Sequence, residues 1–234
     1  MSVRAVLWDA DGVLQHTPDC SWDLAAQVVA QFPDPLIGAA IDEDRIRATV
    51  HRLGLDDHVE DILSVWSTFD LLAPSLEVVS LVRAAGTACY LATNQDSYRA
   101  AGMRQNTAYD QILDGLYFSC DIGIAKPSRA FFKHVVTDLG LVPDQLLFLD
   151  DQSKNIAGAR SAGLNAEQWA HDDGVARLTD ILHAHGVRVD QARDESCQYP
   201  SDAANDQEHR CRLIGCLGEV GSCGRFGTSG RSFQ

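Results

Sequence analysis

The sequence predicts an α/β fold in which helices cover both faces of a parallel sheet and a small helical domain follows the first strand. Short apolar runs recur along the chain, and helical patterns separate the later ones, which is the order of elements in a parallel sheet. About eighty residues separate the first run from the second, too many for a simple crossover between strands. We therefore expect an insertion at that place.

Five apolar runs are the expected strands. The first leads into the polar turn Asp9-Ala10-Asp11-Gly12, the pattern of a buried strand that reaches the edge of a sheet. The runs lie at 5–8, 87–92, 116–119, 146–149 and 165–169.

Helical patterns fill the segments between these runs. Ser21 and Asp44 are candidate N-caps in the insertion, Gly54 is a candidate stop, and Gly163 closes the last helix. The expected helices lie at 21–31, 44–53 and 56–71 in the insertion, and at 76–85, 129–139 and 153–162 outside it. We assign 1–16 and 72–189 to the core domain and 17–71 to a helical cap.

Residues 190–234 have a different character. Asp, Gln, Ser and Gly dominate there and the apolar residues lose their periodicity, so we expect a low-complexity, disordered tail. The tail holds His209 and four cysteines but no CxxC pair, so unpaired thiols are favoured over a metal site. Cys20, Cys89 and Cys120 are expected to be free thiols as well. The tail cysteines are Cys197, Cys211, Cys216 and Cys223.

The charge of the chain limits its partners. The formal net charge is -14 and the only lysines are Lys126, Lys133 and Lys154, so no basic surface for a nucleic acid is expected. No apolar run approaches the roughly 20 residues that span a bilayer, and the N-terminus has no signal-peptide pattern. We expect a cytoplasmic protein without nucleic-acid or membrane partners.

Asp9 and Asp11 are the first candidate site residues. They stand where a buried strand ends, and folding alone does not call for two carboxylates there. In a parallel sheet the carboxyl ends of the strands are the usual ligand position, and Gly12 allows a sharp turn. An Asx-turn that ends the strand is the alternative, and it explains only one of the two aspartates.

Thr93, Asn94 and Lys126 are candidates for holding an anion. Thr93 and Asn94 follow the second strand, where a hydroxyl and neighbouring N–H groups can bind a phosphoryl oxygen; a helix cap is the alternative. Lys126 precedes Pro127 and a helical run, whose positive end would add to the attraction of the lysine for an anion. An exposed structural lysine is the alternative for Lys126.

Asp150 and Asp151 follow the strand at 146–149, and Asn155 lies in the helix after them. Adjacent carboxylates repel each other unless a cation intervenes, and hard oxygen ligands of this kind suit Mg²⁺. N-capping by Asp151 is the alternative, but it leaves Asp150 unexplained.

The segments WDADGVL, LATN, AKP and FLDDQSKNIAGARSAGL resemble, in order and spacing, the four motifs of the haloacid dehalogenase superfamily. The resemblance covers about 3–189 and implies a Rossmann-like core with a helical cap. The stretch 117–163 is most similar to the branch that holds bacterial sugar-phosphate phosphatases and the phosphatase domain of soluble epoxide hydrolase. A magnesium-dependent phosphatase of a small phosphorylated metabolite, with a sugar phosphate first, is what this resemblance implies.

For the site, the resemblance implies covalent catalysis. Asp9 would attack phosphorus and form an aspartyl-phosphate, and Asp11 would act as the acid and then the base. Thr93, the Asn94 amide and Lys126 would hold the phosphoryl oxygens.

The resemblance also implies how Mg²⁺ is bound. The ligands would be the Asp9 carboxylate, the Asp11 backbone carbonyl and the Asp151 carboxylate, with Asp150 orienting ligands or waters from behind. Asn155 stands where other members carry an aspartate, which predicts a weaker affinity for Mg²⁺.

Two other functions stay open. A phosphomutase of the same fold would keep its phosphoryl group from water, and a catalytically silent binding module would keep only the fold. Asp11 disfavours the dehalogenase branch, which needs no metal and lacks the second aspartate. The cap would recognise the substrate. The sequence indicates neither the identity of this substrate nor the oligomeric state. The candidate cap residues are Trp22, Arg45, Arg47, His51 and Trp66.

Overall fold

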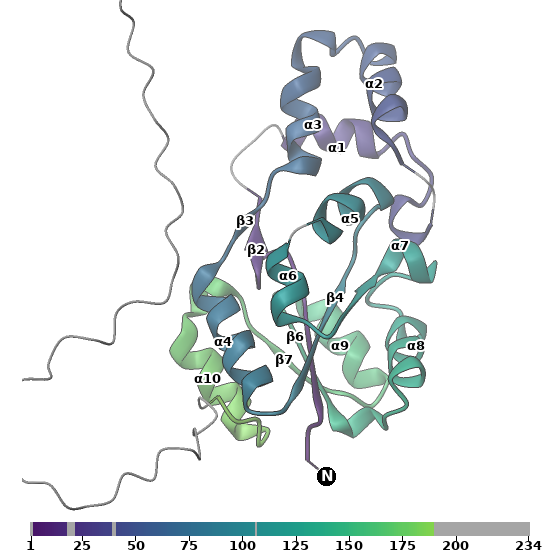
Figure 1. Cartoon of the computed structure of the whole chain (residues 1–234). Helices are drawn as coiled ribbons and strands as arrows, with labels where there is room; N and C mark the ends of the chain where they lie inside the picture. The colour runs from purple at the N-terminus through teal and green to yellow at the C-terminus, as the bar shows by residue number, and fades with distance from the viewer. Residues whose placement is uncertain (1, 18–21, 39–40, 106, 190–234) are drawn as a thin grey trace, which may run out of the picture. The chain divides into compact units, whose positions relative to one another are not determined.

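A five-stranded parallel sheet lies at the centre of the protein (Figure 1). The computed structural model describes residues 2–17, 22–38, 41–105 and 107–189. The strand order β5-β4-β1-β6-β7 puts β1 in the middle, between β4 and β6. All five strands overlap the runs expected from the sequence. They are β1 Ala5–Trp8, β4 Ala88–Thr93, β5 Gly115–Phe118, β6 Leu146–Asp150 and β7 Asn165–Gln168.

Helices cover both faces of this sheet, as expected for a Rossmann-like α/β fold. Val6 and Trp8 of β1 belong to one apolar cluster, and Ala5 and Leu7 belong to another, because successive side chains of a strand point to opposite faces. The first cluster contains side chains of α4 Ala73–Ala84, α5 Ser97–Arg104, α6 Thr107–Ile112 and α10 Val175–Ala184. The second contains side chains of α8 Arg129–Leu139 and α9 Ser153–Ser161. The shorter elements are α7 Ser119–Ile122, η3 Pro143–Gln145 and η4 His171–Asp173.

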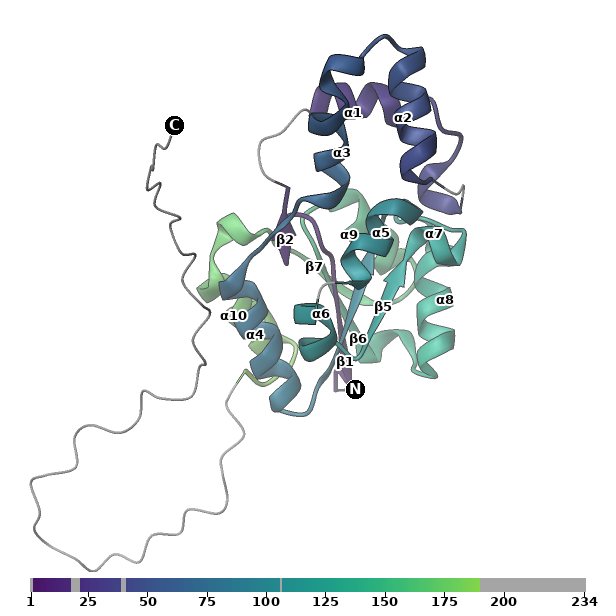
Figure 2. The same cartoon turned by 45° about the horizontal axis from the view of Figure 1, so that its top comes forward.

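Three further helices occupy the long connection between β1 and β4 (Figure 2). Two short antiparallel strands flank these helices in the sequence: β2 (Gln15–His16) precedes them and β3 (Asp70–Leu71) follows them. The helices have an apolar cluster of their own, in which Val28, Ile46 and Ile62 are fully buried. Their bounds are α1 Trp22–Val29, α2 Glu43–Arg52 and α3 Val59–Ser67, joined by η1 Pro35–Ile37 and η2 Asp56–His58. The division into a core and a cap at 17–71 stays a prediction.

Some expected boundaries are wrong. Asp42, not Asp44, caps α2, because Asp42 is extended and its carboxylate accepts a hydrogen bond from the Arg45 N–H. The single helix expected at 56–71 is divided into η2, α3 and β3, since the chain becomes extended at Thr68. Helices α5, α6, α7 and α10 have no counterpart among the expected ones. The first three are too short to give a clear apolar period.

Some expectations concern residues that the structure does not describe. Cys20, Ser21 and the tail 190–234, with His209 and its four cysteines, lie outside the described residues. Cys89 and Cys120 are free and buried, which confirms the expectation for these two thiols. Among the described helices, none has the length and apolar character needed to cross a membrane.

Candidate active site

Three neighbouring strands bring the sequence motifs to one edge of the sheet. β1 pairs in register with both β4 and β6. Asp9 directly follows β1, Thr93 ends β4 and Asp150 ends β6. The motifs therefore meet at the carboxyl ends of the strands, where parallel sheets bind their ligands.

Lys126 joins two of the carboxylates at this edge. Its ammonium nitrogen lies 2.7 Å from Asp9 Oδ1, 2.7 Å from Asp150 Oδ2 and 2.9 Å from the carbonyl oxygen of Ala92. These contacts use all three N–H donors of the ammonium group, and the lysine is only 4% exposed. A phosphoryl oxygen that binds Lys126 has to share or replace one of these contacts.

The buried charges of this cluster do not balance. Burial raises the pKa of Asp9 to about 7; Lys126 opposes this change and Asp150 adds to it. Burial lowers the pKa of Lys126, but Asp9 and Asp150 outweigh it, so the net shift is upward and the ammonium stays charged. Burial also raises the pKa of Asp151. Asp9 and Asp150 share one lysine and Asp151 lies beside them, so a further cation would complete the pairing of the three carboxylates.

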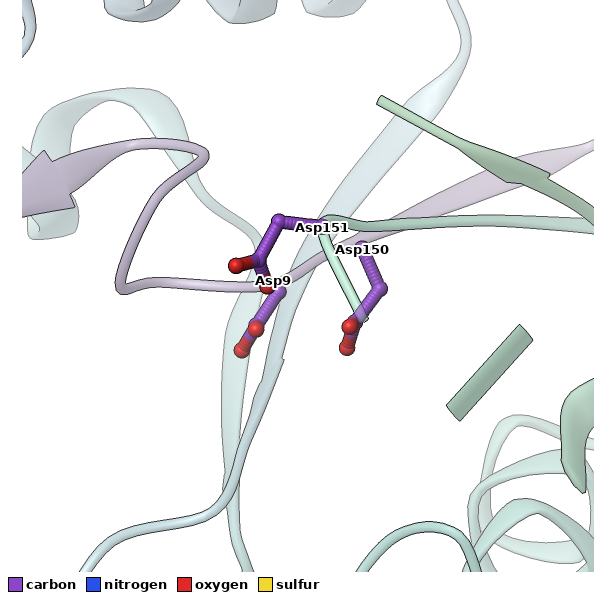
Figure 3. A group of neighbouring side chains, drawn as sticks. All are labelled: Asp9, Asp150 and Asp151. Carbon is purple, nitrogen blue, oxygen red and sulfur yellow. The ribbon is translucent and has the colours of Figure 1, made fainter. Parts of the chain in front are cut away.

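Asp9, Asp150 and Asp151 form a group of carboxylates that fits such a cation (Figure 3). Each offers an oxygen that lies within 4.8 Å of the other two, and carboxylate oxygens are the ligands that Mg²⁺ takes in proteins. Asp150 already accepts hydrogen bonds from Lys126, the Gln152 N–H and the Asn155 side chain. Asp9 and Asp151 therefore stay the predicted metal ligands, and Asp150 stays the residue predicted to orient the ligands or waters.

Asn155 adds a second feature that fits a hydrated cation. Its Nδ2 donates to both carboxylate oxygens of Asp150, at 3.0 Å each. Its Oδ1 is buried and has no hydrogen-bond partner among the described residues. Because buried polar atoms are normally satisfied, often by ordered water, a metal-bound water is a suitable partner for this oxygen.

Gly12 allows Asp151 to approach the turn that follows Asp9. The glycine has a φ of +82°, and a Cβ placed on it would lie 3.0 Å from Asp151 Oδ2. Any larger residue would meet both a strained backbone and a carboxylate. Gly12 is thus required by the site as well as by the turn.

Three donors hold the carboxylate of Asp11. Oδ1 accepts from Gln15 Nε2 and Arg99 Nη2, both at 2.9 Å, and Oδ2 accepts from Gln95 Nε2 at 2.6 Å. Sequence reasoning missed all three residues. Gln95 directly follows the Thr93-Asn94 pair, so its position in the sequence could have suggested it. Arg99 had no such signal, because it reaches Asp11 only through the packing of α5 against α3.

Thr93 and Asn94 are placed by their neighbours. Thr93 is buried, and its Oγ1 lies 3.4 Å from Gln95 Nε2. The Asn94 side chain donates to the Lys126 carbonyl and accepts from the Lys126 N–H, at 2.8 Å each. This pair of bonds holds the backbone of Lys126, so the anion contact predicted for Asn94 would fall to its backbone amide.

A cavity of about 240 Å³ opens beside Asp11, between the carboxyl edge of the sheet and the inserted helices. A larger hollow of about 650 Å³ lies at the other end of the sheet, around Arg83 and Asp114, far from the carboxylate group. Because the candidate catalytic residue Asp11 lines the smaller cavity, we take that cavity as the candidate substrate site. Its wall is formed by Asp11, Ala25, Val29, Leu36, Val65, Trp66, Asn94, Gln95, Asp96 and Arg99.

Trp66 is the one described candidate of the insertion that lines this cavity. Arg47 is paired with Glu43 and Glu60 on the surface, and His51 is paired with Asp56. Arg45 lies over the ring of Phe32. The side chain of Trp22 is outside the described part of the chain.

Comparisons of the sequence connect this site with known proteins. A family model for haloacid dehalogenase-like hydrolases matches residues 3–163. A sesquiterpene phosphatase of Aspergillus oryzae is 27% identical over 100 residues, which is 42% of this chain and 51% of that protein. A drimenol cyclase of Aspergillus calidoustus is 34% identical over 78 residues, which is 33% of this chain and 15% of that protein. The chain thus matches about half or less of the length of these relatives.

Solved structures share the fold. A HAD family enzyme of Bacteroides thetaiotaomicron in complex with magnesium and inorganic phosphate has a TM-score of 0.63 at 19% identity, covering 76% of this chain and 99% of that one. The L-2-haloacid dehalogenase of Xanthobacter autotrophicus has a TM-score of 0.52 at 16% identity, covering 77% of this chain and 83% of that one. At such identities the likeness establishes the fold alone.

Proposed function

The chain belongs to the haloacid dehalogenase-like hydrolases, and from that premise we propose that it is a magnesium-dependent phosphatase of a small phosphorylated metabolite. The observation that carries the proposal is the contact between Asp9 and Lys126, 2.7 Å apart at the end of β1. A buried carboxylate beside a buried ammonium is suited to attack an anion, because the ammonium offsets the repulsion between nucleophile and phosphate.

In the first step, a carboxylate oxygen of Asp9 attacks phosphorus in line with the ester bond. The bond between phosphorus and the ester oxygen breaks, and Asp11 gives a proton to the departing alcohol. In the second step, Asp11 takes a proton from a water that attacks the phosphorus of the aspartyl-phosphate. Inorganic phosphate leaves, and the Asp9 carboxylate is restored.

The remaining residues bind and orient. Thr93, the Asn94 amide and Lys126 hold phosphoryl oxygens, and the Asn94 side chain fixes the Lys126 backbone. Mg²⁺, held by Asp9, Asp151 and the Asp11 carbonyl, would supply positive charge that lowers the repulsion between Asp9 and the phosphoryl group. Three donors keep the Asp11 carboxylate in place at the cavity.

Two classes of substrate are candidates. The sequence resemblance favours a sugar phosphate. The relative from Aspergillus oryzae, a sesquiterpene phosphatase, favours the monophosphate of an apolar alcohol. Both are small monoesters, and the chemistry of Asp9 and Asp11 serves either. The cytoplasm is the proposed location, in keeping with the free thiols of Cys89 and Cys120.

Release of inorganic phosphate from para-nitrophenyl phosphate, with and without Mg²⁺, tests the proposal. The expected result is steady turnover that disappears after chelation and returns when Mg²⁺ is added. Transfer of the phosphoryl group to a second hydroxyl without release of phosphate would identify a phosphomutase. Binding of phosphate esters without any turnover would identify a silent binding module.

A further inference from the structure

The cavity beside Asp11 has an apolar wall on the side of the inserted helices. Ala25 and Val29 come from α1, Leu36 from η1, and Val65 and Trp66 from α3. All five are hydrocarbon or aromatic surface, and no charged side chain of these helices lines the cavity among the described residues. A ligand that enters from Asp11 therefore meets apolar contacts from α1, η1 and α3.

The polar residues of the wall are already engaged within the protein. Asp96 accepts a hydrogen bond from the Trp66 indole N–H at 2.9 Å and caps α5 through two backbone N–H groups. The other polar side chains of the wall, Asp11, Asn94, Gln95 and Arg99, also have partners within the protein. Among the described residues, Arg99 Nε is the one buried polar side-chain atom of the wall without a hydrogen bond. Sugar hydroxyls buried here would lose water without gaining an equal set of partners, which is unfavourable.

One residue of the apolar wall, Leu36, is also exposed to solvent. It is 39% exposed, and its neighbour Ile37, which does not line the cavity, is 42% exposed; they are two of the five large hydrophobic side chains that are exposed in the described part of the chain. Both lie in η1, whose flanking residues have positive φ, +47° at Asp34 and +104° at Gly38. Asp34 is the one residue other than glycine with a positive φ among those described. Strain of this kind concentrates at functional segments.

The position of Asp11 gives the direction of the ligand. In the proposed reaction Asp11 protonates the ester oxygen, so this oxygen lies beside it and the phosphoryl group points to Asp9. The rest of the alcohol then extends away from Asp9, into the cavity that Asp11 also lines.

We infer that the phosphatase acts on monophosphates of apolar alcohols, whose hydrocarbon part lies between α1, η1 and α3. The inference rests on the proposed function and decides between its two substrate classes. Affinity for the hydrocarbon comes from burial of apolar surface, which grows with each methylene that enters the cavity.

A series of straight-chain alkyl monophosphates from ethyl to decyl, compared with glucose 6-phosphate, tests this inference. We expect kcat/KM to rise with each added methylene, by up to about fourfold, and then to level off when the cavity is full. The longer alkyl esters should exceed glucose 6-phosphate by at least about tenfold. A flat series, or a preference for glucose 6-phosphate, would overturn the inference and leave the phosphatase assignment intact.

Two leucines of the insertion provide matched variants. Leu36→Ser should reduce the dependence of kcat/KM on chain length, because Leu36 lines the cavity. Leu53→Ser, at a leucine that is 36% exposed and absent from the wall, should keep the full dependence. Equal slopes in both variants would contradict the assigned position of the hydrocarbon.

Binding of the same esters to Asp9→Asn protein, measured by calorimetry, separates this inference from the catalytic one. The variant cannot form the aspartyl-phosphate, so its dissociation constants report contacts alone. We expect Kd to fall with chain length even if no ester is hydrolysed by the unmodified protein. A Kd independent of chain length would refute the apolar subsite, whatever the activity.

Discussion

Arg99 connects the Asp11 carboxylate to the inserted helices. Its Nη2 donates to Asp11 Oδ1 at 2.9 Å and to Thr17 Oγ1 at 2.7 Å, and its Nη1 donates to the Val65 carbonyl in α3 at 2.5 Å. The side chain is 5% exposed. A single guanidinium thus holds both the proposed acid and base and the end of a helix that lines the cavity.

Replacing Arg99 should impair proton transfer. Arg99→Lys keeps the charge but lacks the planar set of donors that reaches three acceptors, so we expect kcat/KM for an alkyl phosphate to fall about 10- to 100-fold, within the usual contribution of a general acid. The loss should be smaller for para-nitrophenyl phosphate, whose leaving group needs little protonation. Equal losses for both esters would indicate a structural role only.

Asp151→Ala should weaken the response to Mg²⁺, since a charged ligand is removed. The concentration of Mg²⁺ for half-maximal rate should rise by about tenfold or more. Asp57→Ala is the control, because Asp57 is exposed on η2, away from the carboxylate group. If the two variants have the same metal titration as the unmodified protein, the metal lies elsewhere.

Gly158→Ala should disturb the position of Lys126. A Cβ on Gly158 would overlap the carbonyl oxygen of Pro127, so α9 or the loop that carries Lys126 has to move. We expect a loss of about 2 kcal/mol or more in the free energy of unfolding and a lower kcat. Denaturant unfolding and steady-state kinetics measure the two effects.

Gly102 is the matched control for Gly158. It also lies inside a helix, α5, but a Cβ there meets nothing within 4 Å. Gly102→Ala should therefore raise stability by about 0.5–1 kcal/mol, because glycine is a poor helix former. Destabilisation by both changes would mean that the contact with Pro127 is not the cause.

Truncation after Val189 should leave activity and thermal stability nearly unchanged. The three apolar clusters of the described chain are built from residues up to Val189, and the sequence after it lacks the periodicity of a packed element. Thermal unfolding and turnover of the shortened chain check this. A large drop in either would show that the tail contributes to the fold or to the site.

The parts of the fold that were predictable are those with strong local patterns. The run at 5–8 is continuously apolar because β1 lies between two other strands and both its faces are covered, so its bounds were correct. Helix α8 was also correct in both bounds, since Ser128 caps it and Gly140 ends it. Short helices such as α7 carry too few residues for such a signal.

The position of a candidate site residue was predictable where one strand end supplies it, as with Asp9 and Asp150. Contacts between residues that are distant in the sequence were not predictable. Asp11 and Arg99 are separated by 88 positions, and only the packing of α5 brings them together. The requirement for glycine at position 158 was not predictable from the neighbouring sequence either. It arises because the backbone of Pro127, a distant residue in the sequence, leaves no room for a side chain there.

The central claim is that Asp9 carries the phosphoryl group during turnover. Asp11→Asn protein supplied with para-nitrophenyl phosphate, whose leaving group needs little protonation, should accumulate the aspartyl-phosphate, because it lacks the base for the second step. Rapid acid quenching followed by mass spectrometry of peptides should locate one phosphoryl group on Asp9, and Asp9→Asn protein should show neither this adduct nor turnover. Hydrolysis by Asp9→Asn protein at a rate near that of the unmodified protein, or a phosphoryl group on another residue, would contradict the account.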